Sequence, residues 1–166
     1  MVSLDAPENV QVEVQVAVDG AAQQWLPTVE KIQGWASAAV KQAGLSQTEQ
    51  LMTVRIVDVD EITQLNTQYR QKTGATNVLS FPFEWPPEVP VEARDASLGD
   101  LVICAAVVEQ EAEAQQKTLE AHWAHMVVHG MLHLQGFDHI NDDEAEAMEA
   151  KEIEIMKNLG FDNPYK

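Results

Sequence analysis

The sequence predicts an α/β (α+β) fold in which a mixed four-stranded sheet is covered by about five to six helices. Three observations lead to this prediction. Segments with strand and helix patterning alternate from residue 10 to residue 69. Two more strand-like segments then follow with no helix between them, and the remaining chain is patterned as helices. No internal repeat or linker divides the 166 residues, so we expect one domain over residues 1–166.

The first half of the chain begins with a strand, a helix and a second strand. Residues 10–18 (VQVEVQVAV) place valine at every second position, which is typical of a strand with one buried face, and Asp19-Gly20 indicates a turn. Residues 28–43 carry an apolar stripe at helical spacing, closed by Gly44. Residues 51–57 (LMTVRIV) are rich in β-branched side chains and predict the second strand.

A capped helix and a basic loop are expected next. The acidic residues at 58 and 60 can cap a helix over residues 61–69. The apolar side chains expected to face inward from it are Ile62, Leu65 and Tyr69. The following loop, residues 70–75, holds two basic side chains, Arg70 and Lys72.

The two remaining strands flank a proline-rich segment. Residues 77–83 (NVLSFPF) predict a third strand, and Pro82 indicates that it ends there or lies at an edge of the sheet. Residues 84–95 contain three prolines and no period, which predicts an irregular, exposed loop. Residues 98–104 (LGDLVIC) predict the fourth strand, with Cys104 as a small core residue.

Helices are expected over the rest of the chain. One covers residues 105–116, and Thr118 begins a long helix that carries four of the histidines. The last helix covers residues 142–159 and ends at Gly160. Residues 141–154 are strongly acidic, but their apolar spacing indicates a solvated helix face rather than a functional acidic tail.

Composition limits the possible partners and the compartment. Ten Lys and Arg oppose 27 Asp and Glu, giving a net charge of −17, so a general nucleic-acid binder with a basic face is not expected. A polyanionic substrate must instead meet a local basic spot or a metal. No apolar run approaches the length of a membrane span, no secretory signal is visible, and the lone Cys104 suits a reducing compartment. We therefore expect a cytoplasmic protein without a membrane partner.

Three of the five histidines lie within residues 129–139 (HGMLHLQGFDH). His129 and His133 are four apart, so on a helix they project from one face about 6 Å apart along the axis and can bind one metal ion. Gly136 can end the helix in the left-handed conformation, and His139 can then fold back as a third ligand. Three imidazoles leave one coordination position open, which is typical of a catalytic metal. Zinc, one ion per chain, suits this set best, although nickel, copper or iron are chemically possible.

Two more histidines and one aspartate complicate the assignment. His122 and His125 share the helix face of the predicted pair. His125 and His133 are separated by about 12 Å along the axis, too far for both to bind one ion. His122 and His125 are therefore expected to line the cleft mouth or to hydrogen bond to a neighbouring helix. Asp138 can either orient a ligand imidazole or serve as a turn residue.

The residue after the first histidine argues against one class of enzyme. Zinc proteases of the HExxH type have their general base, a glutamate, at this position. Here the position is occupied by Gly130. A metalloprotease is therefore disfavoured unless another carboxylate enters the site from elsewhere.

The motif at 129–139 resembles that of the YbeY family of metal-dependent endoribonucleases. Residues 66–82 (NTQYRQKTGATNVLSFP), residues 98–104 and the closing LGF with Pro164-Tyr165 are also similar to blocks of this family, so the resemblance spans residues 10–165. It implies zinc ligation by His129, His133 and His139 and a functional role for Arg70. After Arg70 the family usually has an acidic residue and a proline, whereas this chain has Thr73 and Ala75.

The resemblance implies a single-strand-specific metallo-endoribonuclease that hydrolyses RNA phosphodiesters with a zinc-activated water. It would act in ribosomal RNA maturation, at the 3′ end of the small-subunit rRNA, and in ribosome quality control. A guanidinium such as that of Arg70 can hold a phosphodiester and stabilise its developing charge, and Lys72 can assist. The expected partners are single-stranded RNA and the ribosome or its proteins, not DNA. Two alternatives stay open: a zinc hydrolase of another substrate class, such as a peptidase, and a non-enzymatic ribosome-assembly factor with a structural metal.

Overall fold

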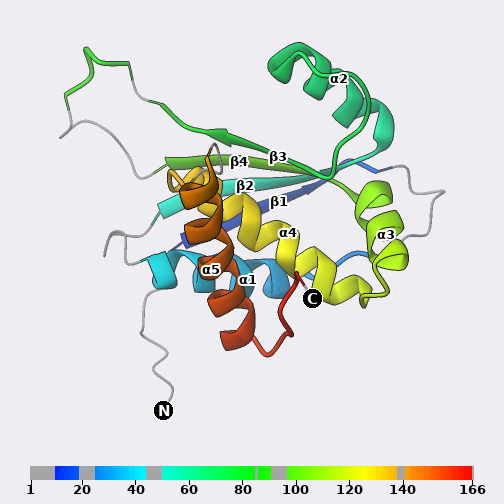
Figure 1. Cartoon of the computed structure of the whole chain (residues 1–166). Helices are drawn as coiled ribbons and strands as arrows, with labels where there is room; N and C mark the ends of the chain where they lie inside the picture. The colour runs from blue at the N-terminus through cyan, green and yellow to red at the C-terminus, as the bar shows by residue number, and fades with distance from the viewer. Residues whose placement is uncertain are drawn as a thin grey trace.

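The computed structural model describes residues 10–18, 25–43, 50–84, 86–90, 97–137 and 141–165. Within these ranges the chain forms four strands and five helices (Figure 1). The strands are β1 (Val10–Val16), β2 (Gln50–Val57), β3 (Val78–Pro82) and β4 (Ser97–Cys104). The helices are α1 (Val29–Ala43), α2 (Val59–Arg70), α3 (Ala105–Ala114), α4 (Leu119–Leu134) and α5 (Asp142–Asn158). The predicted fold class and the order of its elements are confirmed.

The sheet is mixed and has the strand order β1-β2-β4-β3. β2 runs parallel to both β1 and β4, whereas β3 is antiparallel to β4 and forms an edge of the sheet. Pro82 is the last residue of β3, as predicted, and pairs with Gly99 of β4. Gly99 has a φ of 135°, and a Cβ there would lie 2.2 Å from the carbonyl oxygen of Phe81. Only glycine therefore allows the two strands to approach at this point.

The two faces of the sheet are covered unequally. Helices α1, α4 and α5 lie on one face and α2 lies on the other (Figure 1). The larger apolar cluster, on the first face, includes Ile32, Val54 and Trp123, all fully buried. A smaller cluster under α2 contains Val57, Ile62 and Leu79. The alternation of side chains along β2 separates the two clusters, because successive strand residues point to opposite faces.

Helix α4 lies at the centre of the packed face. The Thr118 side chain caps its first turn by accepting a hydrogen bond from the backbone N–H of Ala121 at 3.1 Å, which confirms the predicted helix start. Trp123, Val127 and Met131 are fully buried along the helix. A helix that is apolar around most of its circumference must be surrounded by other elements, and α4 contacts β3, β4, α1, α3 and α5. Its histidines are therefore held on a rigid support.

Two packing predictions are wrong and several predictions lie outside the described residues. Glu152, in the segment predicted to be a solvated face, is fully buried. Tyr69 was expected to face inward, but it is 60% exposed, because the C-terminal turn of α2 reaches the rim of the small cluster. Its ring packs edge-on against Phe81 instead, with centroids 5.5 Å apart. The predicted turn at 19–20, the closing Gly44 and residues 85 and 91–95 of the proline-rich loop lie outside the described residues.

Candidate active site

Four histidines follow one another along one face of α4, as their spacing predicts. The ring centroids of His122 and His125 are 6.1 Å apart, those of His125 and His129 are 6.1 Å apart, and those of His129 and His133 are 4.7 Å apart. The first two rings are buried and the last two are half-buried. The closest pair therefore lies at the more accessible, C-terminal end of the helix.

The geometry of His129 and His133 fits one shared metal ion. Their Nε2 atoms lie 3.2 Å apart. Two imidazole nitrogens that bind one tetrahedral zinc at about 2.0–2.1 Å are separated by about 3.3 Å. Two neutral nitrogen donors are also a ligand set that zinc accepts readily. The donors present in the described residues therefore fit the group that the sequence predicts.

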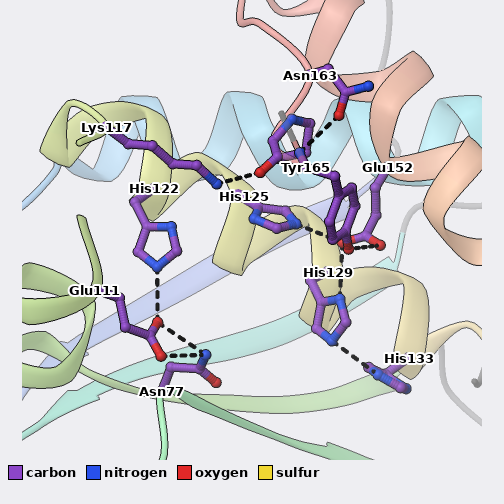
Figure 2. A network of polar contacts seen from close by, with 11 residues as sticks. Asn77, Glu111, Lys117, His122, His125, His129, His133, Glu152, Asn163 and Tyr165 are labelled. Atoms are coloured by element: carbon purple, nitrogen blue, oxygen red, sulfur yellow. Dashed lines mark hydrogen bonds and ion pairs between the residues drawn. The ribbon is translucent and has the colours of Figure 1, made fainter. Parts of the chain in front are cut away.

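A buried carboxylate from α5 joins His129 to His125 (Figure 2). Glu152 Oε1 lies 2.8 Å from His125 Nε2 and 2.9 Å from His129 Nδ1, and Glu152 Oε2 accepts a 2.7 Å hydrogen bond from the Tyr165 hydroxyl. Burial raises the pKa of Glu152, but the hydrogen bonds from His125 and His129 outweigh it and lower the pKa to about 2. Burial and the Glu152 carboxylate both raise the pKa of Tyr165, so its hydroxyl keeps the proton that it donates.

The same residues offer a second way to bind a metal. One nitrogen each from His125 and His129 and one oxygen of Glu152 all lie within 4.8 Å of one another. This group could bind a metal. His125 and Glu152 are buried, whereas His129 is half-buried.

A similar carboxylate holds His122. Glu111 of α3 lies 2.8 Å from His122 Nε2 and also accepts hydrogen bonds from the Asn77 side-chain amide at 3.1 and 3.2 Å (Figure 2). Burial lowers the pKa of His122, and the hydrogen bond to Glu111 opposes this shift only in part. His122 and His125 thus hydrogen bond to neighbouring helices, which was one of their two predicted roles.

Arg70 and the histidine pair line the same cleft, which has a volume of about 470 Å³. Arg70 comes from the last turn of α2 and lines the cleft together with Val78 and Pro82 of β3. The hydroxyl-bearing residues Thr76 and Ser80 also line it. A larger hollow of about 590 Å³ lies over Gln11, Thr53 and Phe83 and contains no histidine. The smaller cleft is therefore the candidate active site.

The structure explains why two positions of the histidine motif are glycine. A Cβ at Gly130 would lie 2.7 Å from Leu101 Cδ2, so the helix approaches β4 too closely for a larger residue without rearrangement. Gly136 has a φ of 100° and ends α4 in the left-handed region, as predicted. A glutamate in place of Gly130, at the position of the protease base, would have to displace the Leu101 side chain.

Two of the predicted residues lie outside the described residues, and two contributors were missed. His139 and Asp138 fall in the range 138–140, so the third ligand is not placed here. The sequence reasoning missed Glu152 and Tyr165. Glu152 could have been found, because it occupies a position in the buried stripe of α5 formed by Met148, Ile155 and Met156. A glutamate within an apolar stripe indicates a buried partner.

The fold and these residues define an α/β protein with a histidine cluster that could bind a metal, beside a cleft. A model of the family described as endoribonuclease YbeY matches residues 15–160. The chain therefore belongs to the YbeY family, whose members are endoribonucleases that act on RNA in rRNA processing. The solution structure of TM1509 from Thermotoga maritima has a TM-score of 0.54 to this chain, with 22% identity and 89% of each chain covered, which supports the fold. In the described part of the chain, none of the helices has the length and apolar character to cross a membrane.

Proposed function

We propose that this protein is a zinc-dependent endoribonuclease, one domain over residues 1–166, that hydrolyses phosphodiester bonds of single-stranded RNA. It would act in maturation of the 3′ end of the small-subunit rRNA and in ribosome quality control. One zinc ion would be held by His129, His133 and His139. Family membership and the cleft between the histidine pair and Arg70 support this proposal.

The observation that carries the proposal is the position of Arg70. An exposed arginine is usually solvated and has no specific role. Here it lines the same cleft as His129 and His133, although it is 59 positions before the nearer histidine. A cation opposite a metal-binding pair is the arrangement that a phosphodiester requires, because its charge grows during hydrolysis.

The chain's own residues would bind and orient the substrate. The Arg70 guanidinium would donate paired hydrogen bonds to the non-bridging phosphate oxygens. The Thr76 hydroxyl lies in the same cleft and can contact the ribose or the phosphate. When bound, zinc would act as a Lewis acid and lower the pKa of a bound water to about 7.

The peptidase alternative receives no support from the arrangement of carboxylates. The glutamate that hydrogen bonds to His129 is Glu152, and it is buried with its oxygens occupied by three donors. Among the described residues that line the cleft there is no Asp or Glu. A metalloprotease needs such a carboxylate as general base.

The experiment that tests the proposal combines elemental analysis with cleavage of a single-stranded RNA. We expect about one zinc per chain, cleavage that stops on chelation, and recovery when zinc is added back. His133→Ala should stay folded by circular dichroism and lose zinc and cleavage together. A chain that is fully active without metal would overturn the proposal.

A second variant separates phosphate binding from metal binding. Arg70→Lys keeps the charge but removes the paired donors, so cleavage should fall by about 10–1000-fold while zinc content stays unchanged. Unchanged cleavage would exclude the proposed role of Arg70. If His133→Ala unfolds, the metal is mainly structural and the assembly-factor alternative gains support.

A further inference from the structure

Glu152 is the most unusual charged residue of the described chain. It is fully buried, whereas Glu146, Glu149 and Glu154 on the same helix are exposed. Burying a carboxylate is costly unless it receives hydrogen bonds. The three donors that meet it come from His125, His129 and Tyr165 and satisfy both of its oxygens.

The contact with His129 determines which ring nitrogen carries the hydrogen. Glu152 Oε1 lies within hydrogen-bond distance of two ring nitrogens, and a carboxylate oxygen accepts hydrogen bonds, so we assign His129 Nδ1 as the donor to Oε1. In a neutral imidazole the other nitrogen, Nε2, then carries no hydrogen and can act as an acceptor or as a metal ligand. That atom lies 3.2 Å from His133 Nε2 and faces the cleft. Glu152 thus prepares His129 to bind a metal through Nε2.

His125 and Tyr165 complete the support on the other sides of the carboxylate. His125 Nε2 shares Oε1 with His129, while its own Nδ1 is buried with no hydrogen-bond partner in the described structure. The Tyr165 ring also packs edge-on against His125, with centroids 5.3 Å apart. The C-terminal segment therefore holds Glu152 in place from outside the cleft.

We propose that Glu152 is a positioning residue for the metal centre. It sets the tautomer and the ring orientation of His129, and it is itself held by His125 and Tyr165. The inference rests on the proposed function, because it assumes that His129 and His133 share one ion. Carboxylates that accept the second N–H of a ligand histidine typically change metal affinity by about 10–100-fold.

The contact distances favour this role over direct ligation by Glu152. The separations of 2.8 and 2.9 Å are hydrogen-bond distances. Donors that share a tetrahedral zinc lie about 3.3 Å apart. An ion between His125, His129 and Glu152 would also lie away from the cleft, because His125 and Glu152 do not line that cleft. A catalytic ion must remain accessible to substrate.

The first test is the imidazole tautomer, measured by ¹H–¹⁵N NMR on the full chain before and after zinc addition. We expect the His129 hydrogen on Nδ1 in both states of the wild type. In Glu152→Gln this preference should be lost. A wild-type His129 that carries its hydrogen on Nε2 would overturn the inference, and this measurement does not depend on whether the variant folds.

The second test is zinc affinity, measured by competition with a chelator. Glu152→Gln should bind zinc about 10–100-fold more weakly, and Tyr165→Phe should show a smaller loss. Glu146→Gln, an exposed glutamate on the same helix, is the matched control and should bind as the wild type does. Equal affinity in a folded Glu152→Gln protein would refute the positioning role.

The outcomes distinguish this inference from the proposed function. A wild-type chain that binds no zinc contradicts the proposed function, while the tautomer of His129 still shows whether Glu152 fixes that ring. Two results together would make Glu152 a direct ligand and overturn the inference: folded Glu152→Gln binds no zinc, and wild-type His129 carries its hydrogen on Nε2.

Discussion

Several buried polar side chains of the described residues have a specific hydrogen-bond partner. Asn66 donates to the carbonyl oxygen of Gly74 at 3.0 Å, and Ser37 accepts from Gln33 at the same distance. His122 and His125 each contact a glutamate at 2.8 Å. An unpaired polar group in a protein interior costs about 1–3 kcal/mol, so each pairing removes a penalty rather than adding a large gain. Of these groups, His122 is the one expected to make the free energy of unfolding depend on pH.

His122 should make the stability depend on pH. Burial lowers its pKa below the ordinary 6.5, Glu111 opposes the shift in part, and positive charge on His125 and Lys117 adds to it. Below pH 6.5 the unfolded chain therefore binds more protons at this residue than the folded chain does. The free energy of unfolding should fall as the pH is lowered from 6.5 to the folded pKa, by up to about 1.4 kcal/mol per pH unit.

The variant His122→Gln keeps a donor for Glu111 but does not titrate in this range. Urea unfolding at several pH values should give a flatter dependence for the variant than for the wild type. Identical slopes for the two proteins would show that His122 titrates normally.

At the scale of elements, a close approach between α4 and the sheet positions the histidine pair. Gly130 allows the helix backbone to meet Leu101, and the carbonyl oxygen of Gly130 accepts a 3.3 Å hydrogen bond from Ser80 of β3. This contact lies immediately beside the histidine pair. The depth of the helix in the packed layer therefore determines where His129 and His133 meet the cleft.

Gly130→Ala should destabilise the fold, because the added methyl group would overlap Leu101. We expect a loss of about 1–3 kcal/mol in the free energy of unfolding, measured with urea. Gly34→Ala in α1 is the matched control, since no atom lies within 4 Å of the added Cβ. It should be neutral or stabilising by up to about 1 kcal/mol. Equal effects of the two substitutions would show that the contact with Leu101 relaxes freely.

At the scale of the whole molecule, the negative net charge disfavours binding of the proposed RNA substrate. The net charge is −17, so the general surface repels RNA, and under the proposed function attraction would depend on Arg70 and a bound metal. Affinity for free RNA should consequently be low. Specific binding would then require a partner, which we propose to be the ribosome or its proteins.

The salt dependence of RNA binding tests this view. Contact with one or two phosphates predicts a slope of log K against log salt of about −0.7 to −1.4 for a single-stranded RNA. Fluorescence anisotropy over a salt series measures it, and Arg70→Gln should reduce the slope by about 0.7. A much steeper slope, or tight binding to random duplex RNA at physiological salt, would reveal a basic surface that the composition does not predict.

Local sequence patterns were sufficient to predict the helices and strands and the close approach of His129 and His133. The period of two in β1 and the stripe in α1 depend only on which side chains are apolar. The approach of His129 and His133 follows from helix geometry, and the left-handed Gly136 follows from its lack of a side chain. These features involve residues a few positions apart, so the sequence alone determined them.

Tertiary structure decided the strand order and the surroundings of the histidines. The sheet places β4 between β2 and β3, and in the folded chain Arg70 lines the cleft, whereas the sequence indicated Arg70 only through family resemblance. Glu152, in the helix after the motif, lies in a segment whose pattern predicts a solvated acidic face. Its partners His125, His129 and Tyr165 become neighbours only when α5 and the C-terminal segment pack on α4. Periodicity specifies which face of a helix is buried, but the partner of a buried charge depends on how separate elements pack.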